Sequence, residues 1–107
     1  MSGPLKKLCV WLNRLTGGQA YHLCTGSMAP ACPARSLVLV RRRPRHIRPG
    51  MVVLYRTPAM DAPVLHRVVE VCAGGRLLRL KGDANALPDA GLVPQERVLG
   101  RLFLCLR

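Results

Sequence analysis

Two hydrophobic periodicities divide the chain near residue 18. Between residues 5 and 15, leucines recur at spacings of three and four residues, at Leu5, Leu8, Leu12 and Leu15. This spacing predicts an amphipathic helix, which the glycine pair Gly17-Gly18 ends. We expect the helix to pack on its own domain. The alternative is a helix lying in a membrane interface, with Trp11 and the basic residues at the headgroups.

The pattern changes to short runs rich in Val and Leu, separated by Pro and Gly, which is typical of β-strands. The predicted strands are Ser36–Arg41, Met51–Arg56, Val64–Val71, Arg76–Lys81 and Arg97–Leu106. A glycine-bearing turn joins the third and fourth of them into a hairpin. The sequence therefore predicts a mainly β fold, a small barrel-like domain over residues 19–107 that follows the N-terminal helix of residues 1–18.

Length and composition support this picture and limit the possible functions. The chain has 107 residues, room for one small domain, and 50 % of them are apolar, enough for a core. Aromatic residues make up only 4 %, too few for platforms that stack nucleic-acid bases. No run approaches the roughly 20 apolar residues of a spanning helix, so we expect no transmembrane segment in this chain.

Charge is the unusual feature of the composition. The chain has 17 Lys and Arg against 5 Asp and Glu, a formal net charge of +12. This excess favours anionic partners, whether nucleic acid, an anionic membrane or acidic polypeptide. The densest cluster, Arg41-Arg42-Arg43-Pro44-Arg45, is predicted in a turn between strands.

The five cysteines show no paired short spacing of the kind that metal knuckles and redox motifs use. An odd count fits a reducing compartment better than a disulfide framework, although one or two bridges stay open. We expect the thiols to be mostly small buried apolar residues.

Three polar features stand out against this background. Ser27 lies between a glycine and a proline-stopped turn, His66 interrupts an apolar strand, and Asp83 and Asp89 lie close together in a chain with few acids. Each has an ordinary structural explanation, since glycine, serine and aspartate favour turns and strand histidines are often simply core residues. Together they supply the hydroxyl, the base and the carboxylate that nucleophilic acyl transfer needs.

In this order the three segments resemble the motifs of type I signal peptidases, in the branch that carries histidine as base. Gly26-Ser27-Met28-Ala29-Pro30 resembles the nucleophile motif, Leu65-His66-Arg67-Val68 the base motif, and Lys81-Gly82-Asp83-Ala84-Asn85 with Asp89 the third motif. The resemblance runs from about Thr25 to Gly100.

That resemblance implies a serine endopeptidase that cleaves signal-peptide-like or leader segments after small residues. By it, Ser27 is the nucleophile, His66 the general base and Asp89 the carboxylate paired with His66, while Asp83 is a second acid that shapes the site. The sequence does not rank Asp83 against Asp89. Lys81 is the one competing base, and its place before a Gly-Asp turn suggests a structural role. No metal and no cofactor are implied.

Two departures from the family pattern are Arg35-Ser36 and Gly50-Met51, where the family usually has Gly-Asp. We also expect this chain to lack the family's usual membrane anchor. It is then a membrane-associated or cytoplasmic protein that meets an anionic membrane surface or a membrane-anchored partner. Two other hypotheses stay open. One is a catalytically inactive peptide-binding module of the same fold. The other is a basic nucleic-acid-binding domain, although no specific nucleic acid is expected.

Overall fold

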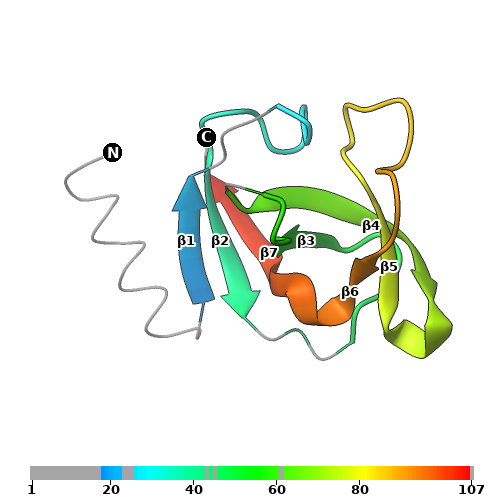
Figure 1. Ribbon diagram of the computed structural model, residues 1–107. Coiled ribbons are helices and arrows are strands. Elements are labelled where there is room, and N and C mark those ends of the chain that lie inside the picture. Colours follow the sequence, from blue (N-terminus) through cyan, green and yellow to red (C-terminus); the bar gives the residue numbers. More distant parts are fainter. Residues whose placement is uncertain (1–17, 23–25, 43, 45, 61, 107) are drawn as a thin grey trace.

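The computed structural model describes residues 18–22, 26–42, 44, 46–60 and 62–106. In this part of the chain, seven strands and two short 3₁₀ turns follow one another (Figure 1). They are β1 (Gly18–His22), β2 (Leu37–Arg42), β3 (Val52–Tyr55), β4 (Val64–Cys72), η1 (Ala73–Gly75), β5 (Leu77–Lys81), β6 (Val93–Pro94), η2 (Gln95–Arg97) and β7 (Val98–Leu106).

The strands form one antiparallel sheet in the order β1-β2-β7-β3-β4-β5-β6. Figure 1 shows that this sheet is strongly curled, with β1 and β6 at its two edges. A bulge between Leu39 and Val40 offsets the β2–β7 register, and another between Leu54 and Tyr55 offsets the β3–β7 register. Bulges bend and twist the strands that carry them, which suits a curled sheet. The predicted mainly β fold is confirmed.

All five predicted strands are present, and each begins and ends within one residue of its predicted bounds. The predicted hairpin is β4–β5, in which Ala73, Gly74 and Gly75 all have positive φ angles. β1 and β6 were not predicted, since one is short and polar and the other is a two-residue strand ending in a proline. The helix expected over residues 5–15 lies outside the described residues, and Gly18, expected at its end, begins β1.

The sheet buries apolar side chains in three clusters. Leu37 to Val40 of β2 are all buried, because Val38 and Val40 enter one cluster while Leu37 and Leu39 enter another. A strand covered on both faces has the continuous apolar run seen here rather than an alternating pattern. Val53 and Tyr55 of β3 join a third cluster with side chains of β4 and β5.

Two details refine the sequence-based picture. Arg42 belongs to β2 rather than to the following turn, because it pairs with Gly100 of β7. Cys32 and Cys105 are joined by a disulfide, and Cys72 is the free cysteine of the described residues. The bridge ties the segment before β2 to the end of β7, and it is one of the one or two bridges that the sequence left open.

Candidate active site

The segment that carries Ser27 is a turn with a buried anchor. The amide of Ala29 donates to the carbonyl of Gly26 at 3.0 Å, and the amide of Cys32 donates to the carbonyl of Met28 at 2.8 Å. Met28 is 1 % exposed and lies in the cluster formed with Val38, Leu54 and Leu65. Ser27 is therefore held in place by the hydrogen bonds of the turn and by the burial of the Met28 side chain that follows it.

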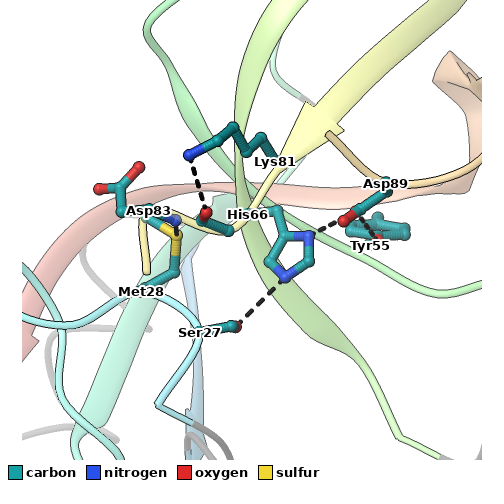
Figure 2. A network of polar contacts seen from close by, with 8 residues as sticks. Ser27, Met28, Tyr55, His66, Lys81, Asp83 and Asp89 are labelled. Atoms are coloured by element: carbon teal, nitrogen blue, oxygen red, sulfur yellow. Dashed lines mark hydrogen bonds and ion pairs between the residues drawn. The ribbon is translucent and has the colours of Figure 1, made fainter. Parts of the chain in front are cut away.

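A second segment, residues 82–85, lies directly against this turn. The amide of Ala84 donates to the carbonyl of Ser27 at 2.8 Å, and the amide of Asp83 faces the sulfur of Met28 at 3.4 Å (Figure 2). Gly82 allows the approach, since a Cβ there would lie 2.8 Å from the Ser27 carbonyl oxygen and 3.0 Å from the Ser27 Cβ. The glycine therefore makes room for the serine.

His66 connects the serine to a carboxylate. It lies on β4 and is 7 % exposed, beside Val53 of β3 in the sheet register. Its Nε2 is 3.2 Å from the Ser27 Oγ, and its Nδ1 is 2.5 Å from the Asp89 Oδ2 (Figure 2). The structure thus brings together three residues that lie 39 and 23 positions apart in the chain.

Asp89 is held by backbone and side-chain contacts. Its amide donates to the carbonyl of Leu80 at 2.8 Å, and its Oδ2 accepts a hydrogen bond from the hydroxyl of Tyr55 at 3.0 Å. Burial, followed by the hydrogen bond to Asp89, raises the pKa of Tyr55 far above its ordinary value of 10.0. The phenol therefore stays protonated and remains a donor to this carboxylate.

Asp83 is placed differently from Asp89. Its two carboxylate oxygens accept hydrogen bonds from Nε and Nη2 of Arg67 at 2.9 and 2.8 Å, and Arg67 also donates to the carbonyl of Gly50 at 2.8 Å. The hydrogen bond with Arg67 lowers the pKa of Asp83. Asp83 thus joins the segment after β5 to β4 through the residue that follows His66.

Lys81 does not point at the serine. Its ammonium donates to the carbonyl of the neighbouring Gly82 at 3.4 Å, and Figure 2 shows the side chain on the other side of that segment from the Ser27 hydroxyl. The geometry therefore gives His66, and not Lys81, access to the hydroxyl proton.

A cavity of about 530 Å³ opens beside this group. Ser27, His66, Asp89 and Tyr55 contribute its polar part. The remaining lining is mainly apolar and consists of Thr57, Met60, Val64, Ala90, Leu92 and Val93. A concave apolar cavity with a few convergent polar groups is the usual form of a ligand or substrate site.

Sequence reasoning missed Tyr55. The signal that would have found it is the alternation of the strand 52–55, which places Tyr55 on the same face as Val53, inside the core. A buried tyrosine hydroxyl generally needs a hydrogen-bond partner. That requirement predicts a polar group beside Tyr55, which in the structure is the carboxylate of Asp89.

Within the described residues, no cluster of three or more His, Cys, Asp or Glu side chains is arranged to hold a metal ion. The same residues contain no helix long and apolar enough to cross a membrane.

Comparison with known proteins gives consistent relatives, although no family model matches the chain. It is 37 % identical over 67 residues to the signal peptidase complex catalytic subunit SEC11 of Yarrowia lipolytica, covering 61 % of this chain and 39 % of the relative. It is also 37 % identical over 76 residues to the subunit of the same name from Eremothecium gossypii. The matched residues cover 68 % of this chain and 46 % of that relative. The chain is a relative of the type I signal peptidases. The resemblance drawn from the three motifs is confirmed.

A third relative, the signal peptidase complex catalytic subunit of Pyrenophora tritici-repentis, is 38 % identical over 71 residues, which cover 64 % of this chain and 41 % of the relative. The chain thus matches less than half the length of these signal peptidase subunits.

Proposed function

We propose that this chain is a peptidase of the signal peptidase type, with Ser27 as nucleophile, His66 as general base and Asp89 as the carboxylate that orients the imidazole. The observation that carries the proposal is the continuous path of contacts from the Ser27 Oγ through both ring nitrogens of His66 to Asp89. A nucleophile in reach of a base, and a base oriented by a third group, define this kind of site.

The reaction follows from these contacts. The Ser27 Oγ attacks the carbonyl carbon of the scissile peptide bond while its proton passes to Nε2 of His66. The tetrahedral intermediate collapses, the C–N bond breaks, and the leaving amine takes that proton from Nε2. A water molecule then attacks the acyl-enzyme with His66 again as base, which releases the carboxylate product and restores the serine.

Asp89 and Tyr55 hold the base in a working arrangement. Because Asp89 accepts from Nδ1, the tautomer with a proton on Nδ1 is favoured and Nε2 keeps a lone pair for the serine proton. Tyr55 donates to the same carboxylate oxygen and restricts its rotation. In this proposal Asp83 shapes the site by bonding to Arg67 and takes no proton.

The substrate is a polypeptide with a signal-peptide-like cleavage site. The apolar wall formed by Met60, Val64, Leu92 and Val93 suits the apolar stretch of such a peptide, and cleavage follows a small residue. The relatives are subunits of a signal peptidase complex. We therefore expect a membrane-anchored partner to present the substrate to this site.

The test is intact-mass analysis of a peptide that spans a signal-peptide junction, incubated in detergent with wild-type protein, Ser27→Ala, His66→Ala or His46→Ala. His46 is an exposed histidine outside the Ser27 cavity, so its variant controls for loss of a histidine. We expect a single cut after a small residue with wild type and His46→Ala, and none with the other two variants.

Cleavage that survives Ser27→Ala would remove Ser27 as the nucleophile. Tight binding of the peptide without any cut, under conditions in which a related signal peptidase complex cleaves it, would instead support the inactive peptide-binding module.

A further inference from the structure

A second cavity, of about 480 Å³, has seven lining residues, of which four are arginines. Its residues come from the end of β2, from the connection between β2 and β3, and from β7. They are Arg41, Arg42, Pro44, His46, Arg48, Met51 and Arg101, which we call the arginine pocket. The proposed catalytic function uses none of them.

The arginine pocket lies away from Ser27. The strand β2 begins after the turn that carries Ser27 and ends at Arg42, so the two regions are at opposite ends of this strand. In Figure 1 the turn before β2 is at the top of the view and the connection after β2 at the bottom. A six-residue strand spans roughly 20 Å. The hydrogen bonds that join Ser27, His66 and Asp89 involve no residue of the arginine pocket, although in the sheet register only Val53 of β3 separates Arg101 from His66.

Like charges are placed directly opposite each other in this pocket. Arg41 of β2 is the register partner of Arg101 of β7, in neighbouring antiparallel strands. Such a pair of like charges destabilises a sheet. Repulsion between the two guanidinium groups lowers the free energy of unfolding unless an anion binds between them.

The acidic side chains of the described residues do not neutralise the opposed pair of Arg41 and Arg101. Glu70 pairs with Arg79, Asp83 with Arg67, and Asp89 with His66. Glu96 lines other cavities, and no carboxylate lines the arginine pocket. Any anion that compensates the pair must therefore come from outside the described residues.

The guanidinium groups specify what kind of anion fits. Each is planar and presents donors in a fork that matches the oxygens of phosphate in a bidentate way. Guanidinium groups around a concave space suit one compact oxyanion, whereas a duplex nucleic acid needs an extended basic face. Arg41 also lies 6.0 Å from the ring centroid of Phe103, which is 51 % exposed, so an apolar side chain adjoins the cationic site.

We infer that the arginine pocket binds a phosphate group, supplied either by the headgroup of an anionic phospholipid or by a free phosphate compound. Arg41 and Arg101 face the group from neighbouring strands, and Arg48 and His46 add donors from the β2–β3 connection. Phe103 provides the apolar contact that a lipid source would use.

The test compares two double variants with the same change of net charge. Arg41→Gln/Arg101→Gln removes the opposed pair, and Arg76→Gln/Arg97→Gln removes two exposed arginines outside the pocket. The Tm of each protein is measured as inorganic phosphate replaces chloride at constant ionic strength. Phosphate should raise the Tm of wild type and of the outer variant, with the apparent affinity for phosphate at least about tenfold weaker in the pocket variant.

A second arm identifies the source of the phosphate group. Sedimentation with phosphatidylcholine vesicles, with or without phosphatidic acid, is measured for the same three proteins. Binding that needs phosphatidic acid, is lost in the pocket variant and is competed by inorganic phosphate supports a lipid headgroup. A phosphate effect on Tm without vesicle binding supports a free phosphate compound.

Three results would overturn the inference. One is an equal loss of binding in the two double variants, which indicates diffuse charge. Another is an unchanged Tm of wild type in phosphate together with no binding to vesicles. The third is binding of a duplex oligonucleotide that depends on the pocket while phosphate and vesicles do not bind, since the partner is then a nucleic acid.

Discussion

Replacing Gly82 by alanine tests whether the close approach of the segment after β5 positions Ser27. The added Cβ would lie 2.8 Å from the Ser27 carbonyl oxygen, whereas ordinary contacts of a Cβ begin near 3.4 Å, so the segments must separate by about 0.6 Å. The nearest atom, the Asn85 Nδ2 at 2.7 Å, belongs to a side chain that can rotate aside, but the Ser27 carbonyl oxygen is a backbone atom and cannot. This movement lengthens the hydrogen bond from Ala84 to Ser27 and the 3.2 Å distance from Ser27 to His66.

Both stability and activity should fall in Gly82→Ala. Overpacking of this kind costs about 2 kcal/mol, which corresponds to roughly 10 °C in Tm for a domain of this size. Misplacing a reacting group by about 1 Å can cost about 100-fold in rate, so we expect kcat/KM to fall by about 10- to 100-fold. The assays are thermal unfolding and peptide cleavage measured well below the Tm of each variant.

Two other glycines provide controls. A Cβ at Gly26 has no neighbour within 4 Å, so Gly26→Ala should change neither quantity much, although it precedes Ser27. A Cβ at Gly100 lies 2.7 Å from the carbonyl oxygen of Arg41, so Gly100→Ala should lower the Tm and leave kcat/KM unchanged. If Gly82→Ala also lowers only the Tm, the close approach stabilises the fold and does not position the serine.

Two further predictions concern the carboxylates. Tyr55→Phe removes a donor to Asp89, so it should lower the free energy of unfolding by about 1 kcal/mol. Because burial raises the pKa of Tyr55, the same variant should remove a tyrosine with a raised pKa from an alkaline absorbance titration. The hydrogen bond from Arg67 lowers the pKa of Asp83 below its ordinary value of 3.8. The ionised Asp83 therefore stabilises the folded protein at neutral pH, and this contribution is lost as pH falls through the lowered pKa. In urea unfolding, the free energy of unfolding of wild type should exceed that of Asp83→Asn by about 1 kcal/mol or less at pH 7, and this difference should shrink as pH falls below 3.8. A difference that stays constant with pH would contradict this.

The strands were predictable because each apolar run is bounded by Pro or Gly and most strands have a buried face. β6 was not predicted because a strand of two residues shows no periodicity. β1 was not predicted because its five residues include a glycine and polar residues. The same reasoning ended this strand at Arg41 and placed Arg42 in the following turn, since charged residues after an apolar run usually mark its end. In this sheet β7 pairs with β2 beyond that run, so the tertiary partner extends the strand.

The sequence brought Ser27 and His66 to attention, but it gave no ranking of Asp83 and Asp89. Both follow β5 within a few residues, and the choice depends on which of them faces β4 at His66 and which at Arg67. That choice is set by the path of the chain after Gly82, where the amide of Ala84 bonds to Ser27 and the amide of Asp89 returns to Leu80. Neither contact has a local sequence signal.

The distribution of acids connects the proposed active site to the arginine pocket. A chain with five acidic residues and a net charge of +12 has few carboxylates to place, and two of them, Asp83 and Asp89, bond around His66 and Arg67. Carboxylates used there are not available at the other end of β2, where Arg41 faces Arg101. Because an uncompensated pair at that position weakens the β2–β7 contact, an anion bound between Arg41 and Arg101 would stabilise the sheet as well as fill the pocket.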